Sequence, residues 1–290
     1  MGLKTPIRKW IAAGRFRAAV AKLLYDMTIA LELAIERILD SVHTIRESPC
    51  RITADYHLTA IVKTFERPRL LRRLLASIMR TYPSLKVIVV DDSSDPTKSS
   101  GAETIFMPYD SGVSVGRNEA LRHVTTKYVM VLDDDFVFYR HTDLEASLAV
   151  MENHPEIDIV GGEVIDLPLF ETGDYSREAL FPTDAEATMP RGTSLGGLPV
   201  YDKTPNFFIA RTDRIRLVGW DPELRRVDHA DFFTRAKGVL TTVFNQNMKC
   251  LHARTPFDSA YMRKREEVER DLEILRDRYS CAAGRQNVSD

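Results

Sequence analysis

The sequence predicts the α/β class, with a mainly parallel central sheet, helices on both faces and an additional helical segment at the N-terminus. Three observations support this prediction. From His57 onward, short apolar runs alternate with amphipathic helical patterns. The runs are apolar along their whole length, as expected for strands that are covered on both faces. Two of them end in clustered aspartates, and sheets of this kind bind ligands at the carboxyl ends of their strands.

The first predicted element is a helix over residues 6–47. Apolar residues recur along it at spacings of three and four and form one seam: Val20, Leu24, Met27, Leu31, Ala34, Ile38, Val42 and Ile45. Basic residues precede its first acid, Asp26, and are interleaved with Trp10, Ile11 and Phe16: Lys4, Arg8, Lys9, Arg15, Arg17 and Lys22. Two interpretations follow, namely packing on the chain's own domain or on a second copy, and peripheral contact with an anionic membrane surface.

Strands and helices then alternate along the chain. The predicted strands are 58–65, 86–95, 104–110, 129–132 and 158–167. The predicted helices are 67–82, 112–126 after a glycine-containing loop, 143–155 and a charged helix at 262–279. Residues 168–204 are rich in Pro, Gly, Ser, Thr and acids, which indicates a long loop near a site. We therefore expect a helical segment at 1–50, a main domain at 51–260 and a helix with a tail at 261–290.

Composition excludes several classes of protein. The chain has 290 residues, 44% of them hydrophobic, and a formal net charge of -2, so no basic field indicates a nucleic-acid partner. Three widely spaced cysteines, Cys50, Cys250 and Cys281, fit reduced thiols better than disulfides or a zinc site. The N-terminus has no long uncharged apolar segment. We expect a cytoplasmic protein, at the inner face of the membrane if the first helix binds it.

Three consecutive aspartates follow the apolar run 129–132. Asp133 and Asp135 lie two positions apart, so on an extended backbone they point the same way and Asp134 points to the other face. Their oxygens suit a hard divalent ion, Mn²⁺ or Mg²⁺, whose other ligands are water and phosphate. The alternative is a set of acids that cap a following helix.

Two further segments fit a nucleotide ligand. Asp91 and Asp92 end the strand 86–95 and could hydrogen-bond a base or ribose, although a turn made by Asp and Ser explains them as well. The glycine loop leads to Arg117 and Asn118 at a helix start, where backbone N–H groups and a guanidinium can hold a diphosphate.

In this order, "DD", "GRN" and "DDD" resemble the nucleotide-sugar-binding half of GT-A glycosyltransferases. Longer strings are similar to the inverting β-1,4-N-acetylgalactosaminyltransferases of the ganglioside type and their bacterial relatives: "KTFERPRLLRRLLASI", "TTKYVMVLDDDFVF", "IVGGEV", "NFFIARTDRIRLVGWDPEL" and "HADFF". The resemblance covers roughly residues 58–255. It implies a GT-A fold and a UDP-sugar donor, with GalNAc as the first choice, and a glycan or glycolipid acceptor that the sequence does not identify.

The resemblance also implies roles for single residues. The donor site would contain Thr64, Arg67, Asp91, Asp92, Arg117, Asp133, Asp134 and Trp220. Thr64 and the Asp91–Asp92 pair would face the uridine, and Trp220 would form an apolar wall for a sugar ring, unless it is a core tryptophan. Asp135 and Asp133 would bind the metal, and His252 would complete its site, unless His252 is an ordinary histidine.

For the catalytic base, the resemblance favours Asp231 in "HADFF". An acid is common in the family where this chain has Ala230, so Asp228 and His229 are kept as rivals. The base would deprotonate an acceptor hydroxyl that displaces the diphosphate in one inverting step, with the metal neutralising the charge on the leaving group.

Two other classes of function are kept as alternatives. "DDDFV" also fits the first motif of haloacid-dehalogenase-type phosphatases, although there the companion acid pair lies downstream, whereas here "DD" lies upstream. A catalytically inactive module that binds nucleotide sugars or glycans would have the same fold. Release of phosphate from phosphomonoesters, or of UDP from a sugar nucleotide, separates these classes.

Overall fold

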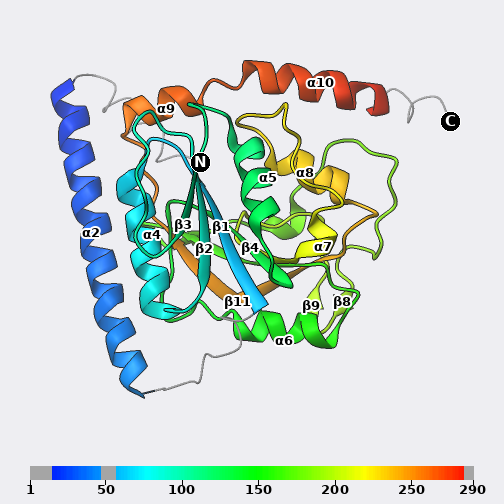
Figure 1. Cartoon of the computed structure of the whole chain (residues 1–290), viewed down its shortest axis with the longest axis horizontal. Coiled ribbons are helices and arrows are strands. Elements are labelled where there is room, and N and C mark those ends of the chain that lie inside the picture. Colours follow the sequence, from blue (N-terminus) through cyan, green and yellow to red (C-terminus); the bar gives the residue numbers. More distant parts are fainter. Residues whose placement is uncertain (1–14, 47–56, 284–290) are drawn as a thin grey trace.

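A computed structural model describes residues 15–46 and 57–283 of the chain (Figure 1). The predicted N-terminal helix is present as α2 (Arg15–Arg46), which lies along one side of the main body. Several basic and apolar residues of the interfacial pattern lie outside the described residues, namely Lys4, Arg8, Lys9, Trp10 and Ile11. No helix in the described ranges is both long and apolar enough to cross a membrane.

The main body contains a mixed nine-stranded sheet, whose principal order is β3-β2-β1-β4-β10-β6-β11-β5. Its strands are β1 (Leu58–Thr64), β2 (Lys86–Asp91), β3 (Glu103–Phe106), β4 (Tyr128–Asp133), β5 (Phe136–Val137), β6 (Ile159–Asp166), β7 (Glu171–Thr172), β10 (Phe208–Arg211) and β11 (Thr242–His252). β3, β2, β1 and β4 are parallel, and β11 is parallel to β6. β10 lies between β4 and β6 and is antiparallel to both. The α/β class with a mainly parallel sheet is therefore confirmed.

The central strands are apolar throughout because both faces of the sheet are covered. Along β1, Leu58, Ala60 and Val62 belong to one buried cluster, whereas Ile61 belongs to the other. β4 alternates in the same way, with Met130 facing the first cluster. This alternation explains why no polar side of these strands could be recognised in the sequence.

Helices form the two covering layers. α4 (Pro68–Thr81) and α6 (Glu145–Asn153) contribute to the first cluster. α5 (Val113–His123), α7 (Thr212–Ile215) and α8 (His229–Ala236) contribute to the second. α4 begins with Pro68 at its first turn, where a missing backbone N–H costs nothing, and buries one stripe of leucines against the sheet.

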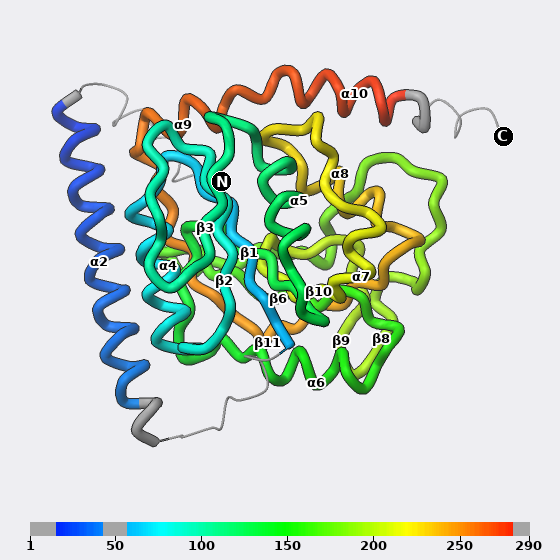
Figure 2. The backbone as a smooth tube through the Cα atoms, viewed as in Figure 1, coloured from blue at the N-terminus to red at the C-terminus, as the bar shows by residue number. Residues whose placement is uncertain are grey.

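Several boundaries differ from the prediction. β2 ends at Asp91, so Asp92 already lies in the turn. The segment that contains "HADFF" is the start of helix α8 and not a turn or strand, and no strand had been predicted at β10 or β11. The predicted charged helix 262–279 is two helices, α9 (Ser259–Arg265) and α10 (Glu269–Ala283). Figure 2 shows them along the top of the view, with α9 at the upper left and α10 above α5 and α8.

The long segment 168–204 is largely irregular, as predicted. It contains β7, one turn of 3₁₀ helix, η1 (Tyr175–Arg177), and a small hairpin of β8 (Ser194–Leu195) and β9 (Leu198–Pro199). Cys250 is a buried free thiol, as expected, and nothing is described for the side chains of Cys50 and Cys281.

Candidate active site

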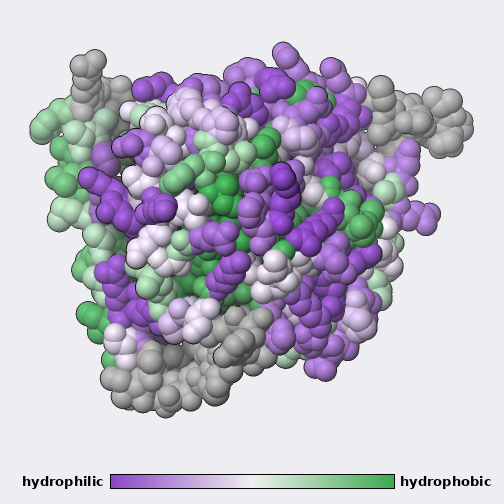
Figure 3. Space-filling model, in the orientation of Figure 1, coloured by the Kyte–Doolittle hydropathy of each residue, from purple (hydrophilic) through white to green (hydrophobic). Residues whose placement is uncertain are grey.

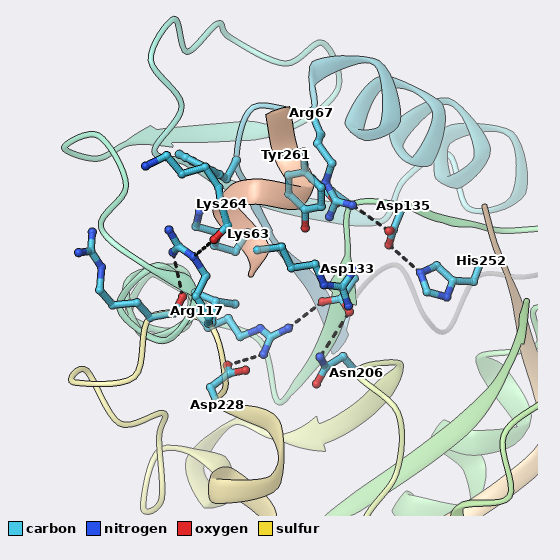
Figure 4. Close-up of a pocket in the computed structure, with 16 residues that line it drawn as sticks. Lys63, Arg67, Arg117, Asp133, Asp135, Asn206, Asp228, His252, Tyr261 and Lys264 are labelled. Atoms are coloured by element: carbon cyan, nitrogen blue, oxygen red, sulfur yellow. Dashed lines mark hydrogen bonds and ion pairs between the residues drawn. The ribbon is translucent and has the colours of Figure 1, made fainter. Parts of the chain in front are cut away.

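A cavity of about 190 Å³ lies at the carboxyl ends of β1 and β4 (Figure 4). Its lining side chains are Lys63, Phe65, Arg67, Val113, Arg117, Asp133, Asp134, Asp135, Asn206, Arg225, Arg226, Asp228, His252, Tyr261, Lys264 and Arg265. Lysines and arginines outnumber carboxylates in this set by seven to four. Excess positive charge in a concave site favours an anionic ligand such as a diphosphate.

All three aspartates after β4 line this cavity. The predicted alternation of Asp134 away from its neighbours is wrong, because β4 ends at Asp133 and residues 134–135 form a turn before β5. Asp134 is buried and its carboxylate accepts hydrogen bonds from Thr64 Oγ1 at 2.7 Å and from Arg67. Protein donors therefore hold together like charges that would otherwise repel one another.

Arg67 neutralises two of these carboxylates. Its guanidinium pairs with Asp134 and, at 2.9 Å, with Asp135 Oδ2, and its Cζ atom lies 4.0 Å from the centre of the Tyr261 ring. Burial raises the pKa of Asp134 to about 6, although Arg67 opposes the shift. Burial acts in the same direction on Asp135, but Arg67 and His252 outweigh it and lower the pKa of that carboxyl. Asp135 is thus kept ionised in a buried place.

His252 and Asp135 are the two residues of the cavity whose spacing is compatible with ligands of one metal ion. His252 Nε2 lies 3.2 Å from Asp135 Oδ1, and two ligands of one octahedral ion at ~2.1 Å stand about 3 Å apart. His252 Nδ1 lies 2.7 Å from Asp166 Oδ1, an arrangement that commonly orients a metal-binding histidine. No cluster of three or more such residues suited to a metal occurs within residues 15–46 and 57–283. An ion here would rely on few protein ligands, as Mg²⁺ sites beside phosphates do.

Arg117 links Asp133 to the start of α8. Its guanidinium donates to Asp133 Oδ1 at 2.7 Å and to Asp228 Oδ2 at 2.5 Å, and the residue is only 3% exposed. Figure 4 shows Asp133 and Asp228 on either side of this guanidinium. Asn206 Nδ2 contacts the other oxygen of Asp133 at 3.3 Å. Burial raises the pKa of Asp228, against the pull of Arg117.

Asp231 and His229, the two catalytic residues of the prediction, are not among the described residues that line the cavity. Asp231 is fully buried and accepts hydrogen bonds from Arg235 Nε at 2.7 Å, Arg278 Nη1 at 2.8 Å and Tyr279 Oη at 2.8 Å. His229 Nε2 donates to the Thr204 carbonyl at 2.6 Å, and burial lowers the pKa of its ring to about 4. The start of helix α8 explains why Asp228 lines the cavity and Asp231 does not, because Asp228 lies at the N-cap and Asp231 lies one turn further along the helix.

Four predicted donor residues lie behind or beside the cavity wall. Asp92 is buried, pairs with Lys63 and accepts a hydrogen bond from the Gly112 N–H at 3.1 Å, and Gly112 has a φ of 101° that favours glycine. Asp91 accepts hydrogen bonds from the backbone and hydroxyl of Ser93, so this pair forms the turn that was the open alternative. Trp220, predicted as an apolar wall for the sugar, is a core residue whose ring stacks on Phe232. Thr64, predicted to face the uridine, contacts the cavity only through its hydrogen bond to Asp134.

Several cavity residues were missed. Tyr261, Lys264 and Arg265 come from α9, in the C-terminal region to which the sequence analysis assigns no site residue, and Arg225 and Arg226 come from the segment before α8. One signal was present in the sequence: Lys63 is a lone charge in the buried strand β1, and a charged residue in such a strand needs a partner. The pairing of His252 with Asp166 could not be read from residues 86 positions apart.

Comparison with known sequences identifies the family of the main body. The profile described as "Glycosyl transferase family 2" matches residues 59–213. β-1,4 N-acetylgalactosaminyltransferase 1 of Mus musculus is 40% identical over 210 residues, and that of Homo sapiens is 42% identical over 203 residues. Each match covers 64% of this chain but only 38% of the relative, so the chain spans well under half the length of these proteins.

Solved structures show the same fold at low sequence identity. The structure of S. aureus TarS 1–349 in complex with UDP-GlcNAc has a TM-score of 0.53 and 17% identity, and the match covers 71% of this chain and 61% of that one. The structure of S. aureus TarS 1–349 gives a TM-score of 0.51 at 18% identity, and the match covers 68% of this chain and 60% of that one. At this identity the likeness supports the GT-A-like arrangement of sheet and helices alone.

Proposed function

The chain belongs to glycosyl transferase family 2, and from that membership we propose that it transfers a sugar from a UDP-sugar to a hydroxyl of a glycan or glycolipid, with inversion at the anomeric carbon. The observation that carries the proposal is the cavity, where an excess of basic side chains surrounds three strand-end aspartates. Cations placed where negative charge develops on a leaving diphosphate stabilise the transition state.

We assign the diphosphate side of the cavity to the basic residues that the sequence did not reveal. Arg225, Lys264 and Arg265 line the cavity from two different elements, and α9 also contributes the Tyr261 ring. The proposal that Thr64, Asp91 and Asp92 lie on the uridine side rests on their position at the ends of β1 and β2. Because Trp220 is a core residue, its proposed effect on the sugar is exerted through Arg117, whose Cζ lies 5.7 Å from the centre of the Trp220 ring.

The metal of this proposal is Mn²⁺ or Mg²⁺. Asp135 and His252 would hold it, with Asp133 near the nucleotide, and it would supply positive charge to the leaving diphosphate when bound. Asp166 keeps the His252 ring oriented through the 2.7 Å contact with Nδ1. Arg67 pairs with Asp134 and with Oδ2 of Asp135, so that Oδ1 of Asp135 is the oxygen directed at His252.

For the general base we propose Asp228 in place of Asp231. Asp228 lines the cavity, whereas all the hydrogen bonds of Asp231 are directed into the protein. Burial raises the pKa of Asp228, and a more basic carboxylate accepts a hydroxyl proton more readily. Arg117 bridges Asp228 to Asp133 and so fixes the base relative to the donor.

The first donor to test is UDP-GalNAc, because the relatives that share 40–42% identity are named N-acetylgalactosaminyltransferases. UDP-GlcNAc is the second, since it is the ligand in the TarS structure. Thermal shifts with each nucleotide sugar, with and without Mn²⁺, measure donor binding, and a ligand at 100 times its Kd adds about 2.7 kcal/mol of stability. Release of UDP from the stabilising donor supports a transferase.

Other outcomes would contradict the proposal. Phosphate release from phosphomonoesters without any effect of UDP-sugars would indicate the phosphatase alternative. Binding of a UDP-sugar without release of UDP, under all metal conditions and with a panel of glycan and glycolipid acceptors, would indicate an inactive binding module.

A further inference from the structure

Helix α2 has two different faces. The inner face packs Ile29 and Leu33 into an apolar cluster of the main body, and Glu36 on the same face pairs with Arg140. The outer face carries large apolar side chains that are each 46–65% exposed: Leu24, Met27, Leu31, Ile35, Ile38 and Val42. Figure 3 shows hydrophobic residues gathered along the edge of the molecule that α2 occupies. An exposed apolar patch of this extent marks an interaction surface.

Between α2 and the main body lies a groove of about 860 Å³, formed with the start of α4 and the segment 254–260. Three arginines of its wall, Arg37, Arg69 and Arg73, form no salt bridge within the described residues, although Arg73 Nη2 donates to the Ala253 carbonyl at 2.9 Å. Two polar atoms of the wall, Arg73 Nε and Thr255 Oγ1, are buried without a hydrogen-bond partner in the same described residues. Unused donors and unpaired guanidinium groups in one groove fit a phosphate group.

The groove opens onto the apolar face. Ala34 lines the groove, and on the helix surface its neighbours three residues before and four residues after are Leu31 and Ile38 of the outer face. A ligand with an anionic head and an apolar tail could therefore place its head at the arginines and its tail along α2. No change in the position of α2 is needed for this.

We propose that this groove and the outer face of α2 form a binding site for an anionic phospholipid at a membrane surface. The phosphate contacts Arg37, Arg69 and Arg73, and the apolar face of α2 enters the interfacial layer of the membrane. A second copy of the chain fits less well, because the face is wider than a two-per-heptad coiled-coil seam: the neighbours Leu23 and Leu24, and Ile38 and Leu39, are all exposed. Dimerisation through this face would also leave the arginines of the groove beside it without a partner.

This site lies next to the proposed donor cavity without being part of it. The segment 252–261 contributes His252 and Tyr261 to the cavity and Arg254 and Ser259 to the groove. The lipid site and the proposed transferase activity are tested by separate measurements, because donor hydrolysis in solution needs no membrane.

The test is co-sedimentation of the full chain with vesicles of phosphatidylcholine, with and without phosphatidylglycerol. We expect binding only to the anionic vesicles, and weaker binding at high salt. Arg37→Gln with Arg69→Gln should reduce partitioning about thirtyfold, at about fivefold for each arginine. Leu31→Gln with Ile38→Gln should abolish binding, whereas donor hydrolysis should stay unchanged in both variants.

The control is Arg270→Gln with Arg276→Gln, which removes the same charge from exposed positions of α10, away from α2. It should bind vesicles like the original chain. If the control and the groove variant lose vesicle binding equally, the vesicles attract positive charge in general, and the proposal of a specific site is overturned. Failure to bind anionic vesicles would overturn the proposal. A dimer in analytical ultracentrifugation that Leu31→Gln with Ile38→Gln dissociates would assign the surface to a second copy instead.

Discussion

The substitutions Asp228→Asn and Asp231→Asn should differ in the rate of transfer per folded molecule, although each removes a partner from a buried ion pair. Asp228 lines the cavity and Asp231 does not. In Asp228→Asn the amide oxygen can still accept from Arg117, but the group can no longer take a proton. A general base contributes about 10²–10⁴-fold to the rate. Transfer should fall by about that factor, while the affinities for UDP-sugar and Mn²⁺ stay close to their original values.

Asp231→Asn should show the opposite pattern. Removing one partner of a buried ion pair costs about 3–5 kcal/mol. The side chains of Arg235 and Arg278 are 28% and 29% exposed, so water can solvate part of the charge that loses its partner. We therefore expect a loss of about 2–3 kcal/mol in the free energy of unfolding. The rate per folded molecule should change little.

The assay for this comparison is UDP release with acceptor present, normalised to the folded fraction from urea denaturation of the same sample. Asp228→Ala is a further control, since it also removes the acceptor for Arg117 and should weaken donor binding. If Asp231→Asn loses transfer at unchanged stability while Asp228→Asn stays active, then Asp231 is the base and the reasoning from the cavity wall is refuted.

Three further predictions follow from single contacts. Asp135→Ala should abolish Mn²⁺-dependent UDP binding with the fold intact, and calorimetry that finds the same Mn²⁺-dependent affinity would contradict its role as a ligand. Asp166→Asn should weaken Mn²⁺ binding about 10–100-fold, because His252 loses the carboxylate that orients its ring. Titration of Mn²⁺ in the presence of UDP measures this loss, and an unchanged titration would rule out the orienting role of Asp166. Burial lowers the pKa of His229 to about 4 from an ordinary value of 6.5, so between these pH values the unfolded state binds more protons and stability should fall as the pH drops. His229→Gln should flatten that dependence in urea denaturation, and an unaltered slope would mean that another group causes it.

The sequence predicted the parts of the fold that depend on local pattern. Helix α4 was identified from its amphipathic repeat, and β1 and β4 from continuous apolar runs. β10 was missed because four residues between two parallel strands give too short a pattern to distinguish from a loop. The side chains after β4 were placed wrongly because the alternation rule holds only while the backbone stays extended, and here it turns at Asp134.

The candidate site was predictable where its residues lie in short recognisable motifs or match the family that the sequence resembles. Asp133, Asp135, Arg117 and His252 were assigned to it and all line the cavity. Whether Asp228 or Asp231 faces the cavity depends on where α8 begins, and helix boundaries are the least certain part of any reading of sequence. The cavity wall from α9 depends on how a distant helix packs, as Tyr261 does on Arg67, and no periodicity in the chain encodes that contact.

The reversed strand β10 has a consequence for how the chain folds. It is four residues long, yet it joins the half-sheet β3-β2-β1-β4 to β6 and β11. Until residues 208–211 have emerged from the ribosome, β4 has an unpaired apolar edge and β6 has no link to it. Exposed edges of this kind pair readily with other chains. Nascent chains that stall before this strand should therefore be the species most prone to aggregation and most in need of a chaperone.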